Sequence, residues 1–76
     1  MDEEIFTKQV QVERKLFSFT LKQNPRGRFL RITEDVGGRR DTIIIPSPGL
    51  KDIQLALEQA LQADQKAGPV PSVLPE

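Results

Sequence analysis

The chain has 76 residues, and its 11 Lys and Arg residues balance its 11 Asp and Glu residues, so the formal net charge is zero. It contains neither Cys nor His, which excludes disulfides and argues against a zinc site. A domain of this size buries only about 60% of the surface of its unfolded chain, so we expect a second copy of the chain to supply the missing stability.

Two runs near the start, residues 5–13 and 16–23, alternate between apolar and polar side chains. The apolar positions share one parity within each run, and they are Phe6, Val10, Val12, Phe17, Phe19 and Leu21. Alternation of this kind predicts two strands, each with one buried face and one polar face. We expect the short turn between them at Arg14 and Lys15.

The segment Asn24-Pro25-Arg26-Gly27 predicts a type I turn, because it places Pro at the second position and Gly at the fourth. A third strand is expected over residues 28–34. In this strand Leu30 and Ile32 face inward, whereas Phe29, Arg31 and Thr33 face outward.

A hairpin loop around Gly37-Gly38 is expected to lead into a fourth strand at residues 42–46, which ends at Pro46. Three consecutive isoleucines in this strand predict that it is buried on both faces. Four antiparallel strands in sequence therefore form a meander.

A helix is expected after the fourth strand, with Ser47 as its N-cap and Pro48 at its first position. Its apolar stripe should pack on the apolar side of the sheet, and it consists of Leu50, Ile53, Leu57, Ala60 and Leu61. Residues 67–76 contain three prolines and no periodicity, which predicts a disordered tail after a single domain at residues 1–66. The predicted fold class is α+β, in the order ββββα.

Positive charge is concentrated in the middle of the chain. Residues 7–46 carry nine Lys and Arg against four Asp and Glu, a net of +5. Parity places Lys22, Phe29 and Arg31 together on the polar face of the sheet. Single-stranded nucleic acids are bound by such a combination, because cations neutralise phosphates and an aromatic ring stacks on a base. The alternative is a protein-interaction module in which Phe29 anchors a partner chain or peptide.

An enzyme is not expected. The chain lacks His and Cys, its acidic residues are scattered, and Ser18 has no base near it in sequence. No phosphate-binding or dinucleotide motif is present, and no cofactor is implied. No apolar run is long enough to cross a membrane and no secretory signal is evident, so we expect a cytoplasmic protein, with association with the nucleoid as an open option.

The segment "LKQNPRGRFLRI" resembles the PUR repeat of the Pur-alpha family, the purine-rich-element binding proteins. Repeats of that family carry a Lys-x-Asn-x-Arg/Lys pattern followed by Gly-Arg-Phe-Leu-Lys/Arg-Ile. This chain has Lys22, Asn24 and Arg26 in the first part and "GRFLRI" at residues 27–32 in the second. The likeness covers residues 4–46 and, less closely, the helix.

The resemblance implies a Whirly-like repeat that completes its domain as an intertwined homodimer. It also implies binding to single-stranded DNA or RNA, often G-rich, and separation of duplex strands. By position, Lys22, Asn24 and Arg26 would contact the nucleic acid, and Phe29 would stack on a base. Arg28 and Arg31 belong to the same basic segment and are counted with the site, and Thr7 and Lys8 fall near the first-strand contact segment of the family.

Overall fold

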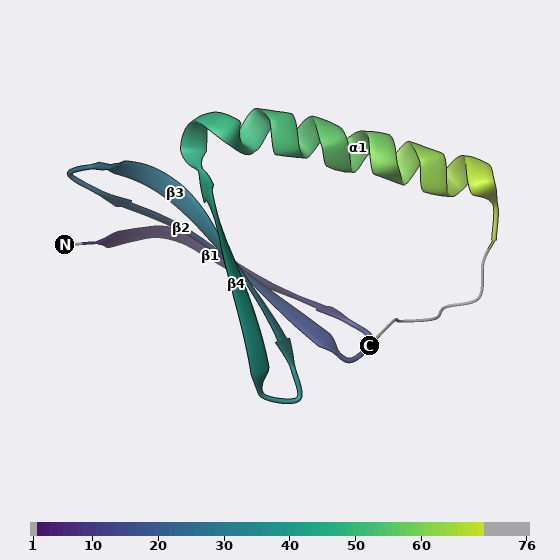
Figure 1. Ribbon diagram of the computed structural model, residues 1–76, viewed down its shortest axis with the longest axis horizontal. Coiled ribbons are helices and arrows are strands. Elements are labelled where there is room, and N and C mark those ends of the chain that lie inside the picture. The colour runs from purple at the N-terminus through teal and green to yellow at the C-terminus, as the bar shows by residue number, and fades with distance from the viewer. Residues whose placement is uncertain (1, 70–76) are drawn as a thin grey trace.

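The computed structural model describes residues 2–69 and has the predicted order ββββα (Figure 1). The four strands are β1 (Glu3–Val12), β2 (Lys15–Asn24), β3 (Gly27–Val36) and β4 (Arg39–Pro46). A short 3-10 turn, η1 (Ser47–Gly49), connects β4 to the helix α1 (Leu50–Ala67). The strands form one antiparallel sheet in the order β1-β2-β3-β4, which confirms the predicted meander.

The two outer turns differ in how well the sequence predicted them. The β3–β4 turn is the expected one, because Gly37 and Gly38 have φ values of 62° and 90° and both central residues of a type I′ turn require positive φ. The β1–β2 turn lies at Glu13 and Arg14, one residue earlier than predicted. Lys15 already pairs with Val12 across the strands, and its ammonium lies 2.8 Å from a Glu34 carboxylate oxygen on β3.

The pairing register divides the sheet into an apolar face and a polar face. Paired residues of neighbouring strands share a face, and Phe19 is paired with Ile32, which is paired with Ile43. By this register the apolar face carries Phe6, Val10, Val12, Phe17, Phe19, Leu21, Leu30, Ile32, Ile43 and Ile45. The polar face carries, among others, Thr7, Gln9, Ser18, Thr20, Lys22, Phe29, Arg31, Thr33 and Thr42.

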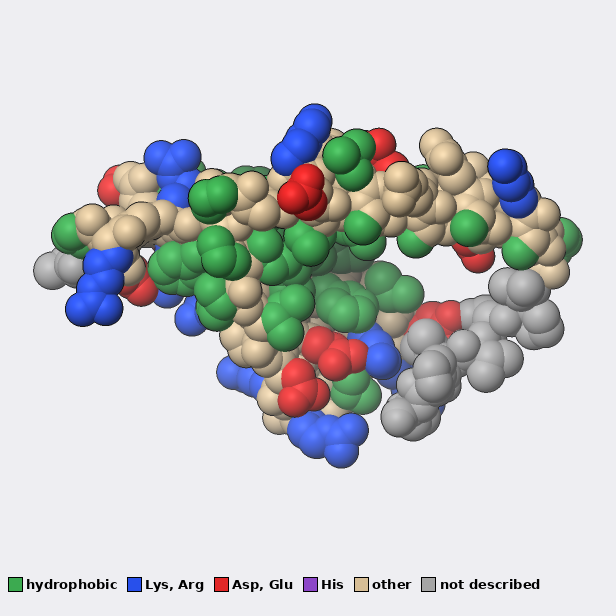
Figure 2. Space-filling model, turned by 45° about the horizontal axis from the view of Figure 1, so that its top comes forward, with side chains coloured by type: hydrophobic (Ala, Val, Ile, Leu, Met, Phe, Trp, Pro, Cys, Tyr) green, Lys and Arg blue, Asp and Glu red, His purple; other side chains and the backbone are tan. Residues whose placement is uncertain are grey.

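The apolar face has no cover within one chain. In the part of the chain that the structure describes, no hydrophobic side chain is buried, and the only buried residue is Thr20 on the polar face. The prediction that α1 packs on its own sheet is therefore wrong: every α1 residue after Leu50 is exposed. Figure 1 shows the helix leading away from the end of β4, and Figure 2 shows hydrophobic side chains gathered over the sheet beside it.

Two of the three isoleucines of β4 are likewise uncovered. Ile43 and Ile44 point to opposite faces and are 58% and 53% exposed, so the predicted burial on both faces is not achieved within one chain. β4 is an edge strand with a neighbour on one side only, which leaves it open both at its edge and on its faces.

The helix starts later than the sequence suggested. Ser47, Pro48 and Gly49 form η1, and α1 follows with Gly49 at its N-cap and no side-chain cap, so the prediction of Ser47 as N-cap is wrong. Pro48 lies in the first turn of η1, where its missing N–H costs nothing. At the other end α1 includes Ala67, the first residue of the predicted disordered tail, and residues 70–76 of that tail lie outside the described residues.

Candidate nucleic-acid interface

The centre of the candidate site is a cross-strand pair on the polar face. Lys22 on β2 is directly opposite Phe29 on β3, and Phe29 is in turn opposite Pro46 on β4. Both Lys22 and Phe29 are half-buried, so neither the ring nor the ammonium is sealed from solvent. Parity predicted this arrangement correctly, and the ring has a cation on one side and an apolar proline on the other.

Phe29 also lines a hollow at the end of the β2–β3 hairpin. This hollow has a volume of about 210 Å³ and is lined by Asn24, Arg26, Gly27, Arg28, Phe29, Ile44 and Pro46. An aromatic ring beside amide and guanidinium groups offers a base both a stacking surface and hydrogen-bond donors.

The hairpin turn itself is fixed by Asn24. Its side-chain Oδ1 accepts a hydrogen bond from the backbone N–H of Arg26 at 2.9 Å, which forms an Asx turn. Pro25 and Arg26 have negative φ values, as the predicted type I turn requires. The Asn24 amide is thereby oriented at the tip, where its Nδ2 donates to Asp2 Oδ1 at 2.9 Å.

Three cations of the site are available for an anion. Within residues 2–69, no ion pair or hydrogen bond engages the side chains of Lys22, Arg26 and Arg31. Other cations are held by the protein: Lys15 pairs with Glu34, and Arg40 pairs with Asp35 through Nε and Oδ2 at 3.2 Å. An unpaired cation can neutralise a phosphate without first breaking an internal contact.

Two of the predicted site residues lie on the other side of the sheet. Arg28 alternates with Phe29 along β3, and its Nε and a terminal nitrogen both donate to Gln23 Oε1, at 3.2 and 3.0 Å. Lys8 is paired with Phe19 and therefore shares the apolar face. The structure thus brings together Lys22, Asn24, Arg26, Phe29 and Arg31 on one face. Arg28 belongs to the other face by register but still lines the hollow at the hairpin end, whereas Lys8 lies on the apolar face away from it.

The polar face continues beyond the hairpin into a second hollow that sequence reasoning missed. This hollow has a volume of about 270 Å³ and is lined by Gln9, Leu16, Ser18, Thr20, Arg31, Thr33, Asp35 and Arg40. Hydroxyl pairs cross the strands here, with Thr7 and Thr20 oxygens 3.3 Å apart and Thr33 and Thr42 oxygens 3.1 Å apart. The type I′ turn at Gly37-Gly38 fixes Arg40 opposite Asp35, and this register was the signal that would have placed Arg40 on the polar face.

Other classes of site find no support in the described part of the chain. It holds no group of three or more His, Cys, Asp or Glu side chains placed to bind a metal ion. Its single α-helix does not combine the length and the apolar character that crossing a membrane would need. An antiparallel sheet with free cations around an accessible ring is the arrangement of a single-stranded nucleic-acid-binding domain.

Comparison with known proteins places the chain within this class. The family model for PurA, described as a ssDNA and RNA-binding protein, matches residues 2–68. The chain therefore belongs to the PurA family, which confirms the resemblance found in residues 21–32. Because this is a non-enzymatic family that binds single-stranded DNA and RNA, membership also confirms that the chain is not an enzyme.

A relative with a curated description is Transcription factor Pur-alpha 1 of Arabidopsis thaliana. It is 55% identical to this chain over 49 residues, a stretch that covers 64% of this chain and 17% of the relative. The chain thus matches a small part of the length of that protein.

Proposed function

We propose that two copies of this chain associate into one domain and that the polar face of each sheet binds single-stranded DNA or RNA through Lys22, Asn24, Arg26 and Phe29. The observation that carries the binding mode is the cross-strand pairing of Lys22 with Phe29 beside two further cations without internal partners. Phosphates are neutralised by the cations while a base stacks on the ring, which is partly open to solvent.

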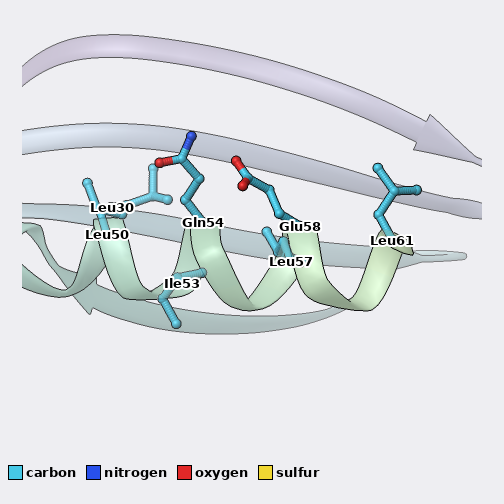
Figure 3. A pocket seen from close by; sticks show the side chains of 7 residues that line it. All are labelled: Leu30, Leu50, Ile53, Gln54, Leu57, Glu58 and Leu61. Atoms are coloured by element: carbon cyan, nitrogen blue, oxygen red, sulfur yellow. The ribbon is translucent and has the colours of Figure 1, made fainter. Parts of the chain in front are cut away.

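Association is supported by two apolar surfaces that one chain leaves uncovered, namely the apolar face of the sheet and the apolar stripe of α1. A groove of about 340 Å³ runs between them, lined by Leu30 on β3 and by the stripe of α1 with Leu50, Ile53, Gln54, Leu57, Glu58 and Leu61 (Figure 3). Leu57 and Leu61 are 65% and 56% exposed. Exposure of apolar surface on this scale is unfavourable by about 25 cal/mol per Å².

A second copy is the occupant that fits both surfaces at once. The stripe of one α1 can cover the apolar face of the partner's sheet while the partner's α1 covers the first sheet, so that both surfaces are buried by one symmetric exchange. Such an exchange also explains why α1 follows η1 away from its own sheet.

Titration of fluorescently labelled 12-nucleotide strands at several salt concentrations tests the binding. Single-stranded DNA or RNA is expected to bind more tightly than the matched duplex, with an affinity that falls linearly with the logarithm of salt concentration. Strands of G-rich and mixed composition show whether G-rich strands are preferred.

Light scattering on the same sample tests the association, and a mass of twice 8.6 kDa is expected. Failure to bind any single strand at low salt contradicts the proposed binding mode and leaves the polar face as a surface for a protein partner. A folded particle of 8.6 kDa contradicts the association alone.

A further inference from the structure

The acidic start of the chain lies along the basic hairpin. Asn24 Nδ2 donates to Asp2 Oδ1 at 2.9 Å, and Gln23 Nε2 donates to Glu3 Oε1 at 3.0 Å. Glu4 is the cross-strand partner of Lys22. Three consecutive acidic residues therefore lie beside three consecutive residues of β2, two of which belong to the proposed nucleic-acid site.

A β-bulge at Ile5 decides which of these carboxylates faces the site. The register steps from Phe6 opposite Leu21 to Glu4 opposite Lys22, so Ile5 is an extra residue in β1. Without the bulge, Ile5 would be paired with Lys22, and Glu4 would lie on the other face of the sheet. Bulges re-aim side chains in this manner, and here the bulge places Glu4 on the polar face with Lys22.

The contact of Asp2 with Asn24 uses the donor that a nucleic acid would need. Asn24 Oδ1 is already committed to the turn, where it accepts the Arg26 N–H. Its Nδ2 is thus the group left for a ligand, and a carboxylate oxygen of Asp2 occupies it as a phosphate or base oxygen would. Asp2 lies before β1, and Asp2 and Glu4 are both exposed, so their side chains can turn away from the site without opening a core.

We propose that the acidic segment Asp2–Glu4 is an intramolecular competitor of nucleic acid, in which Asp2 occupies the Asn24 amide and Glu4 offsets the charge of Lys22. This inference rests on the proposed function. The segment lowers the affinity of the site for every strand. A strand that engages both the Asn24 amide and the Lys22 ammonium displaces it more readily than one that engages the cation alone.

The test compares Asp2→Ala with Asp52→Ala in the titration with 12-nucleotide strands. Both variants remove one carboxylate, but Asp52 is exposed in the first turn of α1, in an element that takes no part in the site. Asp2→Ala is expected to tighten binding by about twofold to tenfold relative to Asp52→Ala, the range that one net hydrogen bond supplies. In an Asn24→Ala background, Asp2→Ala should give no more gain than Asp52→Ala, because the contact it would release is absent.

Each outcome separates the competition from a general charge effect. Equal gains for the two variants, or a gain for Asp2→Ala that persists beside Asn24→Ala, overturn the competition. Weaker binding by Asp2→Ala also overturns it, since Asp2 would then contact the nucleic acid. A Lys22→Ala variant keeps the two proposals apart: if it loses affinity while Asp2→Ala gains none, the competition alone fails, whereas full affinity in Lys22→Ala contradicts the site itself.

Discussion

Lys22 and Phe29 are opposite each other on adjacent strands, so that an ammonium group and an aromatic ring share one face at the same level of the sheet. Within the described residues Lys22 has no ion-pair partner. The pair therefore presents a cation for a phosphate and a ring on which a base can stack, either to one nucleotide or to neighbouring nucleotides of a nucleic-acid strand.

Replacing Lys22 by Ala should weaken binding of single strands and reduce the steepness of the salt dependence. Loss of one phosphate contact lowers the slope of log affinity against log salt by about 0.7 for a single strand. Titrations at four salt concentrations give this slope. Lys51→Ala is the matched control because Lys51 is exposed on α1, and it should leave the slope unchanged. Equal slopes for Lys22→Ala and the unmodified chain would show that Lys22 contacts no phosphate.

Replacing Phe29 by Leu should weaken binding while preserving the salt slope. Leucine keeps apolar bulk beside Ile44 and Pro46 but has no π face, and stacking contributes about 1–3 kcal/mol per base. Affinity at fixed salt is therefore expected to fall, with thermal unfolding close to that of the unmodified chain. An affinity of Phe29→Leu within a factor of two of the unmodified chain would mean that the ring packs against its protein neighbours and does not stack on a base.

Arg31 and Arg28 allow the two faces of β3 to be compared. Arg31 shares the polar face with Phe29, whereas Arg28 is bonded to Gln23 on the other face. Arg31→Ala is expected to reduce affinity several-fold and to lower the salt slope, as one phosphate contact would. Arg28→Ala should have the smaller effect in the same titration. A larger loss of affinity for Arg28→Ala than for Arg31→Ala would show that the bound nucleic acid passes around the hairpin tip to the apolar face.

Much of this arrangement was predictable because strand faces are encoded by period-two alternation. Phe29 and Lys22 fall on the same side of their strands by parity, and the Gly37-Gly38 turn fixes the register between β3 and β4. The position of Glu4 was not predictable, since the bulge at Ile5 inserts one residue and reverses the parity of everything before it. The contacts of the acidic segment follow from that one residue.

The place of α1 could not be predicted for a different reason. The stripe containing Ile53 and Leu57 shows that one side of the helix must be buried, but an amphipathic pattern does not say which chain provides the cover. From the sequence, this cover is assigned to the sheet of the same chain, whereas the structure leaves the stripe exposed. The same limit applies to Ile43 and Ile44. Their sequence pattern indicates burial, but both side chains are exposed in a single chain.

Replacing Leu57 by Asp should abolish the association of two copies. A charge placed in the apolar groove must be desolvated without a partner on assembly, which costs several kcal/mol. Light scattering should then report 8.6 kDa, and circular dichroism should show lost structure because one chain buries no hydrophobic side chain in its described part. Gln59→Asp adds the same charge on the opposite side of α1 and should leave mass and spectrum unchanged. A Leu57→Asp protein that keeps twice the monomer mass would place the interface elsewhere.

Replacing Gly37 by Ala should lower stability, whereas Gly37→Asn should be nearly neutral. Gly37 has a φ of 62° in the β3–β4 turn, a conformation that costs most side chains about 1–2 kcal/mol and that Asn tolerates. Space is not the reason, since an added Cβ at this position meets no atom within 4 Å. Thermal unfolding of both variants at one protomer concentration measures the difference, because association makes the midpoint depend on concentration. Equal unfolding midpoints for the Ala and Asn variants would show that the turn relaxes to another conformation. In that case the turn conformation would not be what fixes Arg40 opposite Asp35.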